Sequence, residues 1–133
     1  MGSQRKTGKF LVFGNIMLRQ DSLPLRLLPR LRRRFPDIEF REFDPSENLE
    51  EEGRNLNIID TVEGIDKVAV ITDIGRIRTQ RLYSMHDFDL SHSLKLLKKL
   101  GYIDSVMILG VPADIGDEEA FAQLSEAIIS SLS

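Results

Sequence analysis

Three side chains in this sequence of 133 residues have the types from which a divalent-metal site could be built. Asp21 lies just beyond the first apolar run, Asp73 directly follows a later one, and His86 lies in a polar stretch before a helical pattern. Carboxylate oxygens and an imidazole nitrogen suit nickel, zinc or manganese. Three protein ligands would also leave coordination positions open for chemistry, or for docking onto a metal.

Each of these residues also has a purely structural explanation. Asp21 precedes a helical pattern, where aspartate is a common N-cap. Asp73 could simply meet water at the end of its strand. His86 could be a surface residue, although Asp87 and Asp89 beside it would raise its basicity or fix its tautomer. The metal site is therefore a hypothesis that depends on the fold bringing the three residues together.

The sequence argues against most other catalytic sites. It has no cysteine, which excludes a disulfide framework, a thiolate zinc site and a cysteine nucleophile. The Gly14-Asn15 pair is not part of a glycine-rich phosphate loop, and neither a serine-nucleophile motif nor His-Glu-x-x-His occurs. The acidic residues and the histidine remain as the candidate chemistry.

The elements that must position these residues follow from the apolar patterns. Strands are expected at 10–13, 38–43, 68–71, 76–83 and 106–109, and helices at 23–35, 46–64, 90–100 and 117–132. Pro29 should kink or split the first helix, and the basic stretch at 76–83 is typical of an edge strand. The alternation predicts an α/β fold of the phosphorylase/hydrolase-like type, with three αβα layers. Its five-stranded sheet should be mostly parallel, with one antiparallel edge strand.

In such sheets, ligands bind beyond the carboxyl ends of the strands. This rule directs attention to 14–21, 73–75 and 110–116, and predicts that Asp21, Asp73 and His86 converge at one sheet edge.

Length and composition limit the class of protein. Residues 1–8 read as a flexible tail and 9–133 as one domain. The net charge of −3 argues against nucleic-acid binding, and no apolar run is long enough to insert into a membrane. The absence of cysteine and of a signal peptide suits the cytoplasm. A run of arginines at 26–34 precedes acidic residues at 47–52; these are either two solvated faces or a basic surface for an acidic partner.

The order of the motifs resembles the hydrogenase maturation protease family. Its strand into Gly-Asn, with an acidic residue six positions later, matches Phe10-Leu-Val-Phe-Gly-Asn15 and Asp21. The family has a second aspartate after its third strand, matched to Val68-Ala-Val-Ile-Thr-Asp73, then a histidine before an apolar helix, matched to His86. A late strand ending in a Gly-x-x-Pro-like sequence matches 107–114.

The resemblance implies a hydrolase, an aspartic-type endopeptidase that removes the C-terminal peptide of a nickel–iron hydrogenase large-subunit precursor after nickel insertion. Carried over by position, Asp21, Asp73 and His86 would contact nickel that the substrate supplies, or zinc in its place, and Asp21 or Asp73 could be the base. The residues implied in substrate binding are Asn15, Asp44, Ser46, Glu47 and Asn48.

The sequence departs from the family pattern at several glycines. Val12 replaces a first glycine, Ser22 follows Asp21 where a glycine is usual, and Asp44-Pro45-Ser46 replaces most of a glycine-rich substrate loop. These departures leave two alternatives to the peptidase: a non-catalytic protein that docks on the nickel site to check it, and a plain α/β scaffold without metal.

Overall fold

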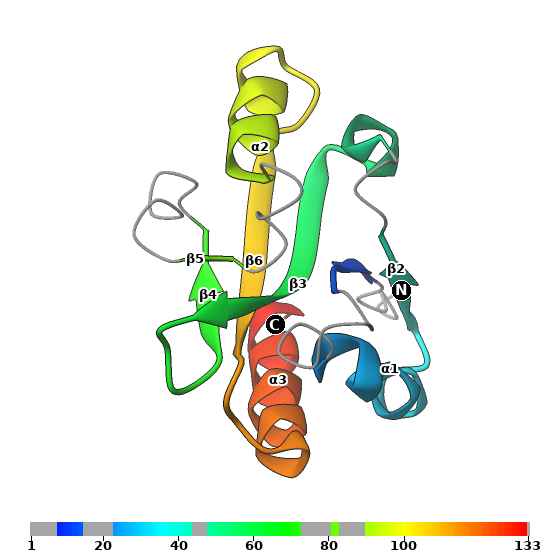
Figure 1. Cartoon of the computed structure of the whole chain (residues 1–133). Helices are drawn as coiled ribbons and strands as arrows, with labels where there is room; N and C mark the ends of the chain where they lie inside the picture. The colour runs from blue at the N-terminus through cyan, green and yellow to red at the C-terminus, as the bar shows by residue number, and fades with distance from the viewer. Residues whose placement is uncertain (1–7, 15–22, 44–47, 73–80, 83–89, 133) are drawn as a thin grey trace.

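The computed structural model describes residues 8–14, 23–43, 48–72, 81–82 and 90–132 (Figure 1). Along the chain these form β1 (Gly8–Val12), α1 (Leu23–Arg34), β2 (Ile38–Glu42), the 3₁₀ helix η2 (Leu49–Glu52), β3 (Asn55–Glu63), β4 (Ala69–Ile71), β5 (Arg81–Leu82), α2 (Leu90–Lys99), β6 (Ser105–Pro112) and α3 (Asp117–Leu132). None of the described helices is long and apolar enough to cross a membrane.

The strands form one mixed sheet in the order β2-β1-β3-β6-β4. The first four run parallel, and β4 runs antiparallel to β6 at one edge. The two residues of β5 pair antiparallel with Val62 and Glu63 of β3, beyond the last residue of β1. The predicted α/β class, with a mostly parallel five-stranded sheet and an antiparallel edge strand, is confirmed.

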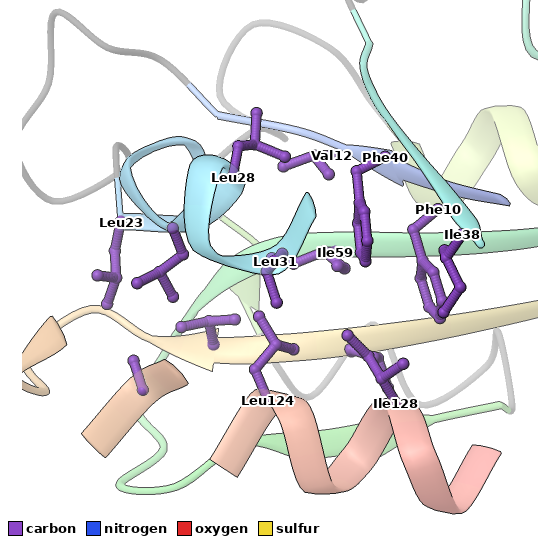
Figure 2. Close-up of a cluster of buried hydrophobic side chains, with 14 residues drawn as sticks. Phe10, Val12, Leu23, Leu28, Leu31, Ile38, Phe40, Ile59, Leu124 and Ile128 are labelled. Carbon is purple, nitrogen blue, oxygen red and sulfur yellow. The ribbon is translucent and has the colours of Figure 1, made fainter. Parts of the chain in front are cut away.

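Each face of the sheet carries its own apolar cluster. Helices α1 and α3 lie on one face, where Leu31, Leu124 and Ile128 pack against Phe10 and Ile59 of the strands (Figure 2). On the other face, Leu94 of α2 packs with alternate strand residues. Burial on both faces explains why the central strands read as continuous apolar runs.

The helix expected at 46–64 is wrong. In the described part of this segment, a short 3₁₀ helix is followed by β3, a nine-residue strand between β1 and β6. The segment is only weakly patterned, and its β-branched residues Ile58, Ile59, Thr61 and Val62 pack well on a pleated surface buried on both sides.

The role expected for the strand at 68–71 also needs correction. β4 is a short antiparallel edge strand, and Val70 is 52% exposed because only one face of this strand is covered. Of the expected edge strand at 76–83, only 81–82 lie within the described residues, where they form β5.

The other helices agree with the sequence patterns. α3 begins and ends at the predicted residues, and α2 ends one residue before the predicted end. Gly101 follows α2 with a φ of 83°, a conformation that glycine adopts without steric cost. Pro29 does not split α1, which continues through it to Arg34. This proline is exposed on the helix surface.

Candidate active site

Most of the predicted site residues lie outside the described residues. This holds for Asp21, Asp73 and His86, and for four of the five substrate-binding candidates, which are Asn15, Asp44, Ser46 and Glu47. Their convergence and their roles therefore stay predictions.

Asn48, the fifth candidate, is described. It precedes η2, and its side-chain amide donates to the Glu51 carboxylate at 3.3 Å. This contact is a local one at the surface.

The described elements show where the connecting segments begin and end. The segment that contains Asp21 runs from the carboxyl end of β1 to the start of α1, and the segment that contains His86 runs from β5 to α2. Because β4 is antiparallel, Ile71 pairs with Ile108, and β4 runs toward the amino ends of the parallel strands. The rule that ligands bind beyond carboxyl ends of parallel strands therefore does not support Asp73, although it still supports Asp21.

One carboxylate that the sequence patterns missed lies at the relevant edge. Asp60 is fully buried in β3, one residue past the last pair between β1 and β3. Strand alternation puts its side chain on the same face as Ile58 and Val62, which is the face that α2 covers. Within the described residues, Asp60 is the sole buried acidic residue.

On the β1 side of β3, strand pairing is interrupted at Asp60 and Thr61, and we call this interruption the notch. The Phe13 N–H donates to the Ile59 carbonyl at 2.9 Å, and the pairing with β5 begins at Val62. Asp60 and Thr61 thus lie between the end of β1 and the start of β5. On the other side, Asp60 is in register with Gly110 of β6, which has no side chain. Asp60 therefore lies next to the carboxyl end of β1 and close to Leu82, the last residue of β5.

Asp60 accepts a hydrogen bond from its own strand: its Oδ1 accepts from the Thr61 N–H at 2.8 Å. A buried carboxylate costs several kcal/mol unless its charge is compensated by hydrogen bonds or by a cation. The carboxylate can ligate a cation or accept a proton.

A complete metal centre needs more than these residues. Among the described residues, no group of three or more histidine, cysteine, aspartate or glutamate side chains could hold a metal ion. Asp60 would have to combine with side chains from the connecting segments.

The sequence did contain a signal for Asp60. Leu56, Ile58 and Ile59 are apolar and lead directly into Asp60, much as an apolar stretch leads into Asp73. Segment 46–64 is weakly patterned and was expected to be helical, so Asp60 was not among the predicted site residues.

The chain has the fold of the hydrogenase-maturing endopeptidases. The hydrogenase maturating endopeptidase HybD from E. coli superposes with a TM-score of 0.66 at 18% identity, over 94% of this chain and 93% of HybD. A hydrogenase 3 maturation protease gives 0.65 at 21% identity, over 90% of this chain and 87% of that one. The [NiFe] hydrogenase maturation protease HycI from Thermococcus kodakarensis KOD1 gives 0.59 at 18% identity, over 98% and 94% of the two chains.

These likenesses span nearly the whole chain, so the resemblance suggested by the motifs is confirmed at the level of the fold. No protein-family model matches the sequence, and no curated protein matches it significantly. A shared fold does not by itself define an activity.

Proposed function

We propose that this protein is an endopeptidase that removes the C-terminal peptide of a nickel–iron hydrogenase large-subunit precursor after nickel insertion. The observation that carries the proposal is the buried Asp60 carboxylate in β3, just beyond the carboxyl end of β1, in a fold shared with hydrogenase-maturing endopeptidases.

We propose that the side chains of Asp21, Asp60 and His86 contact the nickel that the substrate carries. The family's second aspartate follows its third strand; the third strand of this chain is β3, and Asp60 lies in the second half of β3. The notch beside Asp60 adjoins the ends of both segments that contain Asp21 and His86. Asp73, the earlier candidate for this position, becomes the alternative that mutation must test.

The chemistry follows from the ligand types. Nickel supplied by the substrate would polarise the scissile carbonyl or a water molecule. A carboxylate, from Asp21 or Asp60, would take a proton from the attacking water. The water oxygen then bonds to the carbonyl carbon, the C–N bond breaks, and the proton passes to the leaving amine. Only a nickel-loaded precursor would be cut, which couples cleavage to complete insertion.

The direct test incubates the protein with a nickel-loaded precursor and follows the precursor's C-terminus by mass spectrometry. We expect loss of the C-terminal peptide with wild type, and no loss with Asp60→Asn or with a metal-free precursor. Asp73→Asn serves as the matched control and should cut normally. If Asp73→Asn is inactive and Asp60→Asn is active, the assignment of the two aspartates is reversed.

Asp21→Asn separates a metal contact from a helix cap. Asparagine caps helices about as well as aspartate, so this variant should keep its stability whichever role is right. A metal contact predicts almost no cleavage, whereas a cap predicts cleavage at the wild-type rate.

His86 is tested through metal affinity. Calorimetry with nickel or zinc should detect one site that weakens as the pH falls through about 6.5, because a protonated imidazole cannot ligate. His86→Ala should bind more weakly and lose this pH dependence. Equal binding by His86→Ala and wild type would remove His86 from the site.

The second candidate function is a non-catalytic protein that docks on the nickel site to check it. It is favoured by the replaced glycines, of which Val12 is a buried residue at the end of β1. Binding of the loaded precursor without cleavage by the wild type would support it.

A further inference from the structure

Helix α1 has an unusual distribution of charge. Its twelve residues include five arginines and neither a lysine nor an acidic residue, although the whole chain has a net charge of −3. Helix α2 carries three basic residues, and all three are lysines. The planar guanidinium group of arginine can form two parallel hydrogen bonds with one carboxylate, a bidentate geometry that the lysine ammonium group cannot form. The composition of α1 therefore points to carboxylate pairing.

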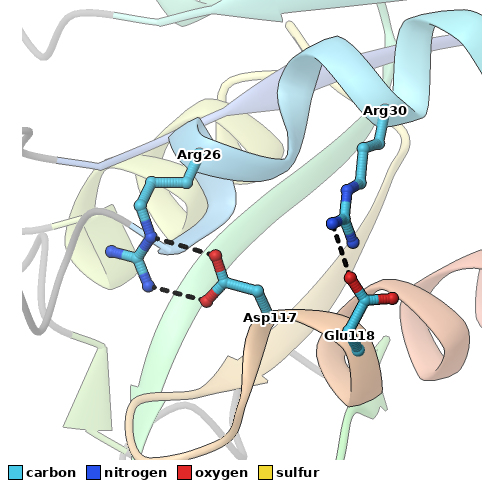
Figure 3. A network of polar contacts seen from close by, with 4 residues as sticks. All are labelled: Arg26, Arg30, Asp117 and Glu118. Carbon is cyan, nitrogen blue, oxygen red and sulfur yellow. Dashed lines mark hydrogen bonds and ion pairs between the residues drawn. The ribbon is translucent and has the colours of Figure 1, made fainter.

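The first two turns of α1 already bind carboxylates from α3 (Figure 3). The Arg26 guanidinium donates to Asp117 through two nitrogens, at 3.1 and 3.4 Å. One turn later, Arg30 donates to Glu118 at 2.5 Å. The acidic first turn of α3 thus lies along a row of arginines on α1.

The row continues past the end of this contact. Arg33 and Arg34 lie three and four residues after Arg30, so they occupy the next turn on the same side of the helix. Both are exposed, and neither has a carboxylate partner within the described part of the chain. Within the described residues, the row therefore ends in two guanidinium groups without a carboxylate partner, of which that of Arg34 lies 5.5 Å from the centre of the Phe35 ring.

A shallow, widely open depression of about 490 Å³ lies at this end of the row. Its lining consists of Arg30, Arg33, Arg34, Glu118 and Phe121, and we call it the arginine groove. The Arg30 guanidinium lies 5.7 Å from the centre of the Phe121 ring, which gives the groove an aromatic wall. The groove thus combines an aromatic surface with two guanidinium groups, those of Arg33 and Arg34, that have no carboxylate partner among the described residues.

We propose that the arginine groove binds an acidic segment of a partner protein. Carboxylates of the partner would pair with Arg33 and Arg34 as Asp117 and Glu118 pair with the preceding arginines, and an apolar side chain would contact Phe121. Basic residues in a last turn also complement the helix dipole, but lysines serve that purpose in α2, and the dipole does not require a hollow or an aromatic wall.

The groove suits carboxylates better than a nucleic-acid backbone. Arg33 and Arg34 fall short of the extended basic surface that nucleic acids require, whereas each guanidinium can pair with one carboxylate in bidentate geometry.

The groove lies between α1 and α3, on the opposite face of the sheet from Asp60. It is therefore separate from the proposed active site, and the inference does not depend on peptide cleavage.

The test measures binding of a fluorescein-labelled peptide of alternating glutamate and leucine to the full chain, by fluorescence anisotropy at low ionic strength. We expect Arg33→Glu/Arg34→Glu to weaken binding at least about tenfold. The matched control is Lys98→Glu/Lys99→Glu, which changes the net charge equally in the last turn of α2; it should weaken binding less than about twofold. Arg33→Lys/Arg34→Lys keeps the charge but removes the fork, and should weaken binding about threefold.

Several results would overturn the inference. Wild type that does not bind the peptide would do so, as would equal weakening by the arginine and lysine reversals. A DNA oligonucleotide that displaces the peptide more effectively than polyglutamate would identify a phosphate ligand instead. If sedimentation shows dimers that Arg33→Glu/Arg34→Glu dissociates, the occupant is a second copy of the chain. Far-UV circular dichroism checks that each variant is folded, and the lysine variant provides a milder change if the reversal is not.

Discussion

Replacement of Asp60 by asparagine separates a functional carboxylate from a structural one. Asparagine has nearly the same shape, and its Oδ1 can still accept the Thr61 N–H that Asp60 now accepts at 2.8 Å. The change removes the negative charge and leaves the strand backbone as it is. Asp60→Asn should therefore weaken metal binding strongly while changing the free energy of unfolding only slightly.

The expected change in stability is small because two effects oppose each other. A hydrogen bond to a charged group contributes about 1.5–3 kcal/mol and a neutral one about 0.5–1.5 kcal/mol, so the substitution loses about 1 kcal/mol. Removing the charge also relieves the cost of desolvating a buried carboxylate, which amounts to several kcal/mol. We expect Asp60→Asn to lower the free energy of unfolding by no more than about 1 kcal/mol.

The matched control is Ile58→Ala, two residues earlier on the same face of the strand and fully buried. It should cost about 2–5 kcal/mol through loss of apolar contacts and the cavity left behind. Urea denaturation at pH 7 measures both variants, and calorimetry with nickel measures metal binding. Asp60→Asn should lose metal binding and Ile58→Ala, where folded, should keep it.

The reasoning fails if Asp60→Asn loses more than about 3 kcal/mol, since that loss is typical of breaking a buried ion pair. In that case the carboxylate mainly holds the fold together. It also fails if Asp60→Asn binds nickel as tightly as wild type.

Three further predictions concern the stability of the fold. Gly110→Ala should lower the free energy of unfolding by about 1–3 kcal/mol in urea denaturation, because the added Cβ would lie 2.6 Å from Val62 Cγ2; a neutral result would mean that Val62 moves aside freely. Leu124→Ala, fully buried between α3 and the sheet, should cost about 2–5 kcal/mol in the same assay, and a cost below 1 kcal/mol would contradict the described core. The hydrogen bond from Arg54 lowers the pKa of Asp104, so their pair stabilises the fold above the unfolded pKa of about 3.9 and ceases to do so as the pH falls through the lower, folded pKa. Urea midpoints of wild type and Asp104→Asn should therefore differ at pH 7 and converge toward pH 2; a difference that persists at pH 2 would contradict this linkage.

The sequence predicted the elements whose periodicity is set by burial. The last helix shows Leu124 and Ile128 one turn apart on the buried face, and its boundaries are those expected. The first strand and the strand at 105–112 are apolar because both of their faces are covered. Patterns of this kind can be read locally, because each residue reports its own environment.

The missed strand shows where local patterns are insufficient. β3 begins with alternating polar and apolar residues, and its β-branched residues come after an acidic run with good helix propensity. Only the pairing with β1 and β6 decides in favour of a strand, and those partners are far away in sequence. The site prediction depended on the same count of strands, because the second aspartate was expected after the third strand and the structure adds β3 before the strand that leads to Asp73.

Asp60 and Gly110 together suggest how this fold can hold a buried charge. Asp60 is in register with Gly110, so β6 places no side chain beside the carboxylate on that face. β1 has ended one residue earlier, and β5 pairs only from Val62 onward. The carboxylate is therefore fixed by a central strand, at a position that lies between the part of β3 that pairs with β1 and the part that pairs with β5. A rigid strand supplies a precisely placed ligand, whereas connecting segments can vary in sequence without disturbing the core. The proposed site would combine both: Asp60 from the strand, with Asp21 and His86 from the connections that begin or end beside it.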